Sequence, residues 1–171
     1  MVKNWLLFCV VALALNACGW QLRGSSGVVT FDRLHISAKN PDSGVVRNLE
    51  RQLEASGVTL VDEARDADYS LVIVNEHSSN RAATISSSAR ISERSLTESV
   101  VFQVLDASGK QIYPRTRASV ERVYEYDENN ILATDDEARL LKKEMHDDLA
   151  RQIYNRLRQL RGQPPANAPA S

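Results

Sequence analysis

The sequence is poor in residue types on which many functions depend. Its 171 residues include two cysteines, and aromatic residues make up 6% of the chain. Cys9 lies in an apolar N-terminal segment, so neither a disulfide nor a thiolate metal site can form once that segment is removed. The scarcity of aromatic residues argues against a base-stacking surface for nucleic acid. With 21 basic and 22 acidic residues, the chain also lacks the excess positive charge that attracts nucleic acid.

Motifs for catalysis and for cofactor binding are missing as well. The seven glycines do not reach the spacing of a P-loop, a dinucleotide fingerprint or a nucleophile elbow. His35, His77 and His146 each lack a ligand partner three or four residues away, so they form no metal motif. The neighbouring acids of Asp135–Asp136 and Asp147–Asp148 point about 100° apart on a helix, which does not suit a catalytic pair. We therefore expect no enzyme activity, no metal and no cofactor.

No apolar run is long enough to cross a bilayer as a helix. The longest, residues 5–15, has about eleven residues where roughly twenty are needed. Because Lys3 precedes it, the segment is typical of a secretory signal. The following Leu15-Asn16-Ala17-Cys18 resembles a bacterial lipobox, in which the cysteine becomes the first mature residue and its thiol is joined to diacylglycerol. We predict a signal peptide over residues 1–17.

Cys18 is thus predicted to become an N-palmitoyl, S-diacylglycerol cysteine, the only lipid or cofactor that we expect. The alternative is a secreted protein cleaved after Ala17 with a free thiol. Two or more acyl chains anchor a protein stably in a bilayer. Gly19 follows the cysteine in place of an aspartate, which in enterobacterial-type sorting implies the outer membrane. The Gly/Ser-rich residues 18–27 are predicted to form a lipidated tether.

The first part of the mature chain predicts a strand, a helix and a short strand. Apolar and polar residues alternate over residues 28–37, as in a half-buried strand. Residues 44–56 predict a helix, closed by Gly57 in a left-handed C-cap. A short strand is predicted at residues 58–61. The apolar stripe of the helix consists of Val46, Leu49 and Leu53.

The middle of the chain predicts two long hairpins. Residues 69–74 form an apolar run, and the next 25 positions carry eight serines. We interpret this serine-rich stretch as two strand extensions joined by an exposed loop near residues 86–89. The chain returns to the core at residues 100–105, turns at residues 106–110, and continues as an alternating strand over residues 112–126.

A long helix closes the predicted domain. Thr134-Asp135-Asp136-Glu137 fits a capping box, so we expect the helix to open there. Gly162 is predicted to end it, and residues 162–171 form a Pro/Ala-rich tail that we expect to be disordered. The apolar stripe comprises Leu141, Met145, Leu149, Ile153, Leu157 and Leu160.

This element order predicts an α+β domain over residues 28–161. Its architecture would be a two-layer sandwich, with two amphipathic helices packed on one face of a four-stranded mixed sheet. The other face would then be free, polar and serine- and arginine-bearing. Guanidinium groups bind phosphates, so such a face suits an anionic glycolipid or an acidic protein lumen, or is simply solvated. The hairpins carry Arg81, Arg90, Arg94, Arg115, Arg117 and Arg122.

Three motifs resemble a known family. Cys18-Gly19-Trp20-Gln21-Leu22-Arg23-Gly24 is similar to the opening of the LptE (RlpB) lipopolysaccharide-assembly lipoproteins. Ile112-Tyr113-Pro114 after a glycine turn and Lys143-Glu144-Met145 in the last helix agree with the family in order. The resemblance covers essentially the whole mature chain.

The resemblance implies a lipid-anchored protein of the outer membrane. It implies a heterodimer in which the chain plugs the large β-barrel LptD, assists barrel assembly and binds lipopolysaccharide, without catalysis. The family's basic positions for lipid contact fall near residues 88–90 and at Thr134, which carries no charge. We therefore expect Arg90 and Arg94 to bind lipopolysaccharide. The alternative function is a periplasm-facing lipoprotein adaptor of another envelope complex.

Overall fold

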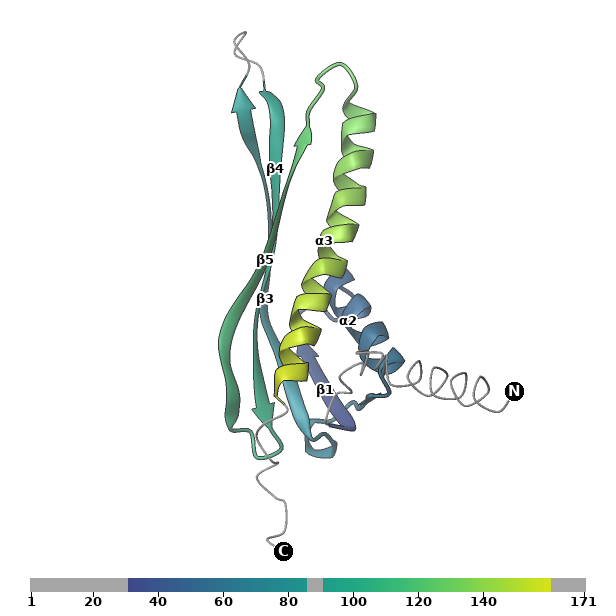
Figure 1. Ribbon diagram of the computed structural model, residues 1–171, viewed down its shortest axis with the longest axis vertical. Helices are drawn as coiled ribbons and strands as arrows, with labels where there is room; N and C mark the ends of the chain where they lie inside the picture. The colour runs from purple at the N-terminus through teal and green to yellow at the C-terminus, as the bar shows by residue number, and fades with distance from the viewer. Residues whose placement is uncertain (1–30, 86–90, 161–171) are drawn as a thin grey trace, which may run out of the picture.

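The computed structural model describes residues 31–85 and 91–160, which form two helices on one face of a mixed sheet (Figure 1). The predicted signal peptide, tether, Cys18, Arg90 and C-terminal tail lie outside these ranges. The elements are β1 (Arg33–Ala38), α2 (Gly44–Ala55), β2 (Thr59–Leu60), a short 3-10 turn η1 (Ala64–Asp66), β3 (Tyr69–Ile85), β4 (Ile91–Asp106), β5 (Gln111–Glu125) and α3 (Ile131–Gln159).

The sheet has five strands in the order β2-β1-β3-β4-β5, so the α+β class is confirmed but the predicted count of four is wrong. The count of four leaves out β2, although a short strand was predicted at residues 58–61 and β2 lies within that range. Strand β1 pairs in parallel with β2 and β3, whereas β3, β4 and β5 are antiparallel. Only two residue pairs, Arg33 with Thr59 and Leu34 with Leu60, join β2 to β1. So short a pairing makes the strand easy to omit from a count.

Helix α2 forms where the sequence predicts it, because both of its ends are specified locally. The Ser43 side chain accepts a hydrogen bond from the Val46 N–H at 3.2 Å, which satisfies one of the free donors of the first turn. At the other end Gly57 adopts a φ of 87°, a left-handed conformation that glycine takes without strain. The predicted stripe of Val46, Leu49 and Leu53 is buried.

Helix α3 begins three residues before the predicted capping box, so that part of the prediction is wrong. Its first residue is Ile131, and Thr134 lies inside the first turn. Instead of capping the helix, the Thr134 hydroxyl accepts the Asp127 N–H at 3.3 Å and ties the helix to the preceding turn. The stripe is confirmed, since Met145, Leu149, Ile153 and Leu157 are all buried.

The molecule is elongated, and its two ends differ. Strands β3, β4 and β5 and helix α3 run its whole length, whereas β1, β2 and α2 cover only one end (Figure 1). We call the uncovered end the arm, comprising residues 79–85, 91–97 and 121–141, and the rest of the described chain the body. No helix within the described ranges is apolar enough over a sufficient length to span a membrane.

Candidate functional site

The arginines of the hairpins do not share one face of the sheet. On β5, Ala118 and Val120 are buried towards the helices, so Arg115 and Arg117 point to the opposite, outer face. Arg122 faces α3, where its Nη2 lies 2.8 Å from an oxygen of Asp148. The expectation of a single arginine-bearing face is therefore correct for only part of the set.

Small hydroxyl side chains occupy the centre of the outer face. The register places Ser79 beside Thr97, and Ser99 beside Ser119. The Thr97 hydroxyl oxygen is buried without a hydrogen-bond partner among the described residues. Ser95 does have a partner, since its hydroxyl donates to Glu121. This confirms that the uncovered face is polar, as the sequence predicts.

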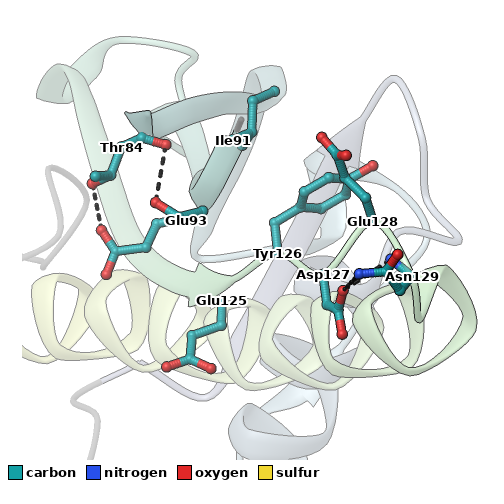
Figure 2. Close-up of a pocket in the computed structure, with 9 residues that line it drawn as sticks. Thr84, Ile91, Glu93, Glu125, Tyr126, Asp127, Glu128 and Asn129 are labelled. Atoms are coloured by element: carbon teal, nitrogen blue, oxygen red, sulfur yellow. Dashed lines mark hydrogen bonds between the residues drawn. The ribbon is translucent and has the colours of Figure 1, made fainter. Parts of the chain in front are cut away.

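A shallow pocket of about 560 Å³ lies at the tip of the arm, between the ends of β3, β4 and β5 and the turn that leads into α3 (Figure 2). Its charged side chains are all acidic. Figure 2 shows Glu93 bound to Thr84, and Asp127 accepting hydrogen bonds from Asn129. The lining residues are Thr84, Ile91, Ser92, Glu93, Glu125, Tyr126, Asp127, Glu128 and Asn129.

Arg94 borders this pocket and is held by an aromatic ring. Its guanidinium carbon lies 4.3 Å from the centroid of the Tyr126 ring, which is cation–π geometry. The buried Nε has no hydrogen-bond partner among the described residues. The charged side chains that line the pocket are acidic and disfavour an anion there, so Arg94 alone makes a weak site for a free anion. Arg90, the other predicted binding residue, lies outside the described ranges.

A buried carboxylate lies where the arm meets the body. The Glu98 side chain is 7% exposed and faces α3, with Lys142 Nζ 3.3 Å from its Oε1 and His146 Nε2 3.5 Å from its Oε2. The Ser78 hydroxyl donates to Oε1 at 2.5 Å. Burial alone would raise the pKa of Glu98, but the hydrogen bonds from His146 and Ser78 and the charge of Lys142 outweigh it, so this pKa is lowered.

The other polar residues singled out in the sequence have separate, structural contacts. His35 Nδ1 lies 3.1 Å from the Val61 carbonyl oxygen, and His77 is exposed. Asp147 accepts from Asn48, whereas Asp148 pairs with two arginines. Within the ranges that the structure describes, no three histidine, cysteine or acidic side chains are grouped to hold a metal ion.

Exposed apolar side chains gather on the arm, which the sequence analysis missed. All five large apolar residues that are exposed in the described chain belong to it. Leu132 is the most exposed of them at 81%, and Leu140 lies two turns further along α3 at 59%. The remaining three are Ile85, Val123 and Ile131. Leu132 and Leu140 share one face of α3, because they are eight residues apart, and this face is a candidate interaction surface.

Comparison with known proteins places this geometry in a family. Residues 31–157 match the family model described as LptE, lipopolysaccharide-assembly. The LPS-assembly lipoproteins LptE of Yersinia pestis (strain Pestoides F) and Yersinia pseudotuberculosis (serotype O:1b, strain IP 31758) are each 30% identical to it over 154 residues, 89% of this chain and 73% of theirs.

Solved structures share the fold. The solution NMR structure of uncharacterized lipoprotein B from Nitrosomonas europaea has a TM-score of 0.70 at 26% identity, covering 83% of this chain and 90% of that one. Rare lipoprotein B from Shewanella oneidensis, at 22% identity, has a TM-score of 0.68 over 76% of this chain and 96% of its own. The family match, the identity and the shared two-layer fold together show that this chain belongs to the LptE family of lipopolysaccharide-assembly lipoproteins.

Proposed function

We propose that this chain assembles lipopolysaccharide at the outer membrane as the partner and plug of an LptD-type β-barrel. The observation that carries the proposal is the arm, in which a long polar sheet ends in a group of exposed apolar side chains. A polar barrel lumen suits the hydroxyl-rich outer face. The exposed residues at the arm would then be buried against the partner, each leucine contributing about 1.5–3 kcal/mol.

The body would hold the chain at the membrane. The start of β1 lies at the end of the molecule opposite the arm tip (Figure 1). A diacylglycerol on Cys18 would therefore attach the body to the periplasmic side of the outer membrane, with the arm directed away from the attachment point. In this arrangement the chain needs no catalytic group, because it acts by filling the barrel and by assisting its assembly.

Lipopolysaccharide binding is part of the proposal. We assign it to Arg90 and Arg94, whose guanidinium groups suit bidentate contacts to lipid phosphates. Stacking on Tyr126 orients Arg94 before any ligand arrives. Because acidic side chains line the adjacent pocket, the site requires both arginines to attract an anion.

The proposed association with a β-barrel is tested by isolating the full-length lipoprotein from gently solubilised outer membranes and identifying what is recovered with it. We expect a large β-barrel in one-to-one ratio with the wild-type chain. Leu132→Asp combined with Leu140→Asp should reduce its recovery at least about tenfold. Ala107→Asp, at the exposed turn on the other end of the β4–β5 hairpin, is the matched control and should leave recovery unchanged. Recovery of the chain alone, or with a soluble partner, would favour the envelope adaptor.

The lipid site is tested with Arg90→Ala combined with Arg94→Ala. We expect at least about a tenfold weaker affinity for purified lipopolysaccharide, since a charge-assisted hydrogen bond contributes about 1.5–3 kcal/mol. Arg65→Ala, an exposed arginine of the body, should bind like the wild type. An unchanged affinity in the double variant would remove both arginines from the site.

A further inference from the structure

The arm is folded around almost no apolar core. Of the buried apolar side chains in the described residues, only Leu96 and Tyr124 belong to the arm, and all the others lie in the body. Beyond Asn75, β3 contributes no buried apolar side chain at all within its described residues. Because apolar burial is the main favourable contribution to folding, the free energy that closes the arm is far smaller than that of the body.

Polar contacts hold the arm together. The Asn80 amide donates to the Tyr124 hydroxyl at 2.8 Å, and Thr84 and Ser95 donate to carboxylates of the neighbouring strands. Such hydrogen bonds contribute only about 0.5–1.5 kcal/mol each, because water replaces them on opening. Arg94 Nε and Thr97 Oγ1 are the two buried side-chain polar atoms without a partner in the described chain, and both lie in the arm. Opening would return them to water.

The Glu98 cluster marks the boundary between arm and body. Lys142 and His146 extend from α3 to this carboxylate on β4, and Ser78 reaches it from β3. His146 also lies against the first residue of α2, since a Cβ placed on Gly44 would be 2.2 Å from its Nδ1. The cluster thus joins α3 to the sheet at the point where α2 stops covering it.

We propose that the arm is a separate conformational unit, which opens and closes while the apolar core of the body stays packed. The Glu98 cluster is its clasp: it lies at the edge of the body next to the arm, and its contacts between α3 and the sheet break on opening. The inference goes beyond the proposed function, because it concerns the isolated chain and holds whether or not the arm enters a barrel. Opening would separate the first half of α3 from the ends of β3, β4 and β5 and leave the body's core intact.

Amide hydrogen exchange on the full chain tests the proposal. We expect wild-type amides of residues 92–97 to exchange at least about 100-fold faster than those of residues 100–105 on the same strand. Leu53→Ala removes a fully buried body side chain and should speed exchange in the body at least about 30-fold. The exchange rates of the arm amides should not change in this variant, because the residue 53 side chain stays packed when only the arm opens. Val46→Ala is the milder variant should Leu53→Ala fail to fold.

The clasp is tested in the same way with Glu98→Gln. Because the clasp breaks whenever the arm opens, exchange of the arm amides should rise about tenfold. Glu63→Gln makes the same chemical change in an exposed ion pair of the body. It should leave the exchange rates of all the amides within about twofold of the wild-type rates.

Two results would overturn the proposal. If Leu53→Ala speeds the exchange of arm and body amides by the same factor, the molecule opens as one unit. If Glu98→Gln leaves the arm amides unchanged, the carboxylate is not the clasp.

Discussion

At the scale of single residues, close packing limits the size of the side chains that fit where α2 meets α3. Gly44 is the first residue of α2, and the ring of His146 occupies the space that any larger side chain would need. The ring cannot move away without loss, because its Nε2 is the atom that faces Glu98. Gly44 is therefore needed for a close approach of the two helices, and its φ does not require glycine.

Gly44→Ala should destabilise the protein by about 1–3 kcal/mol, the usual effect of overpacking. Urea unfolding measures this change in the free energy of unfolding. In a His146→Ala background the same substitution should cost almost nothing, because the ring that it meets is gone. Equal costs in the two backgrounds would show that the contact does not limit the packing.

At the scale of elements, the sequence correctly predicted the helices and strands whose ends are determined by residues within the element or next to it. Helix α2 has an N-cap serine, a three-residue apolar stripe and a C-terminal glycine within about fifteen positions. Its bounds were accordingly predicted to within a residue. The start of α3 was predicted wrongly, because Thr134 suits a cap by its residue type but is used in a contact with the preceding turn.

The candidate site was less predictable, because it depends on contacts between distant elements. Glu98 looks like any polar residue of an alternating strand, and its burial follows only from the position of α3 across β4. In the same way, Leu132 and Leu140 look like members of an apolar helix face. They are exposed because no described residue covers the first turns of α3 on that side. Contacts between elements that are far apart in the chain cannot be inferred from the pattern of a single sequence.

At the scale of the whole molecule, two carboxylates make stability depend on acidity. The pKa of Glu98 is lowered by the contacts of its cluster, which outweigh burial. The pKa of Asp106 is lowered chiefly by the Ser108 side chain, with help from backbone donors of the β4–β5 turn. A lowered pKa means that the folded state holds its proton less tightly than the unfolded chain. The stabilisation is therefore present above the ordinary carboxyl range and is lost as the pH falls through the folded pKa.

The difference in unfolding free energy between the wild type and Glu98→Gln should consequently depend on pH. We expect the wild type to be the more stable protein at neutral pH, and the gap to narrow as the pH falls below 4.5, the ordinary glutamate value. Urea titrations of both proteins at a series of pH values between 7 and 3 measure the gap. A constant gap would mean that the pKa of Glu98 is the same in the folded and unfolded chains.

The sheet has two exposed edges, at which backbone groups lack a neighbouring strand among the described residues. Strand β1 pairs with β3 only as far as Ile73, so the edge of β3 from Asn75 to Ile85 has no neighbouring strand among the described residues, and β5 ends the sheet on the other side. Exposed edges invite strands of other chains. Register shifts after Ile73 and Ala82 interrupt the first edge, and Pro114 removes a donor from β5. Such irregularities are typical of edge strands that resist pairing with other chains, so we expect a variant with a regularised β3 to be less soluble than the wild type.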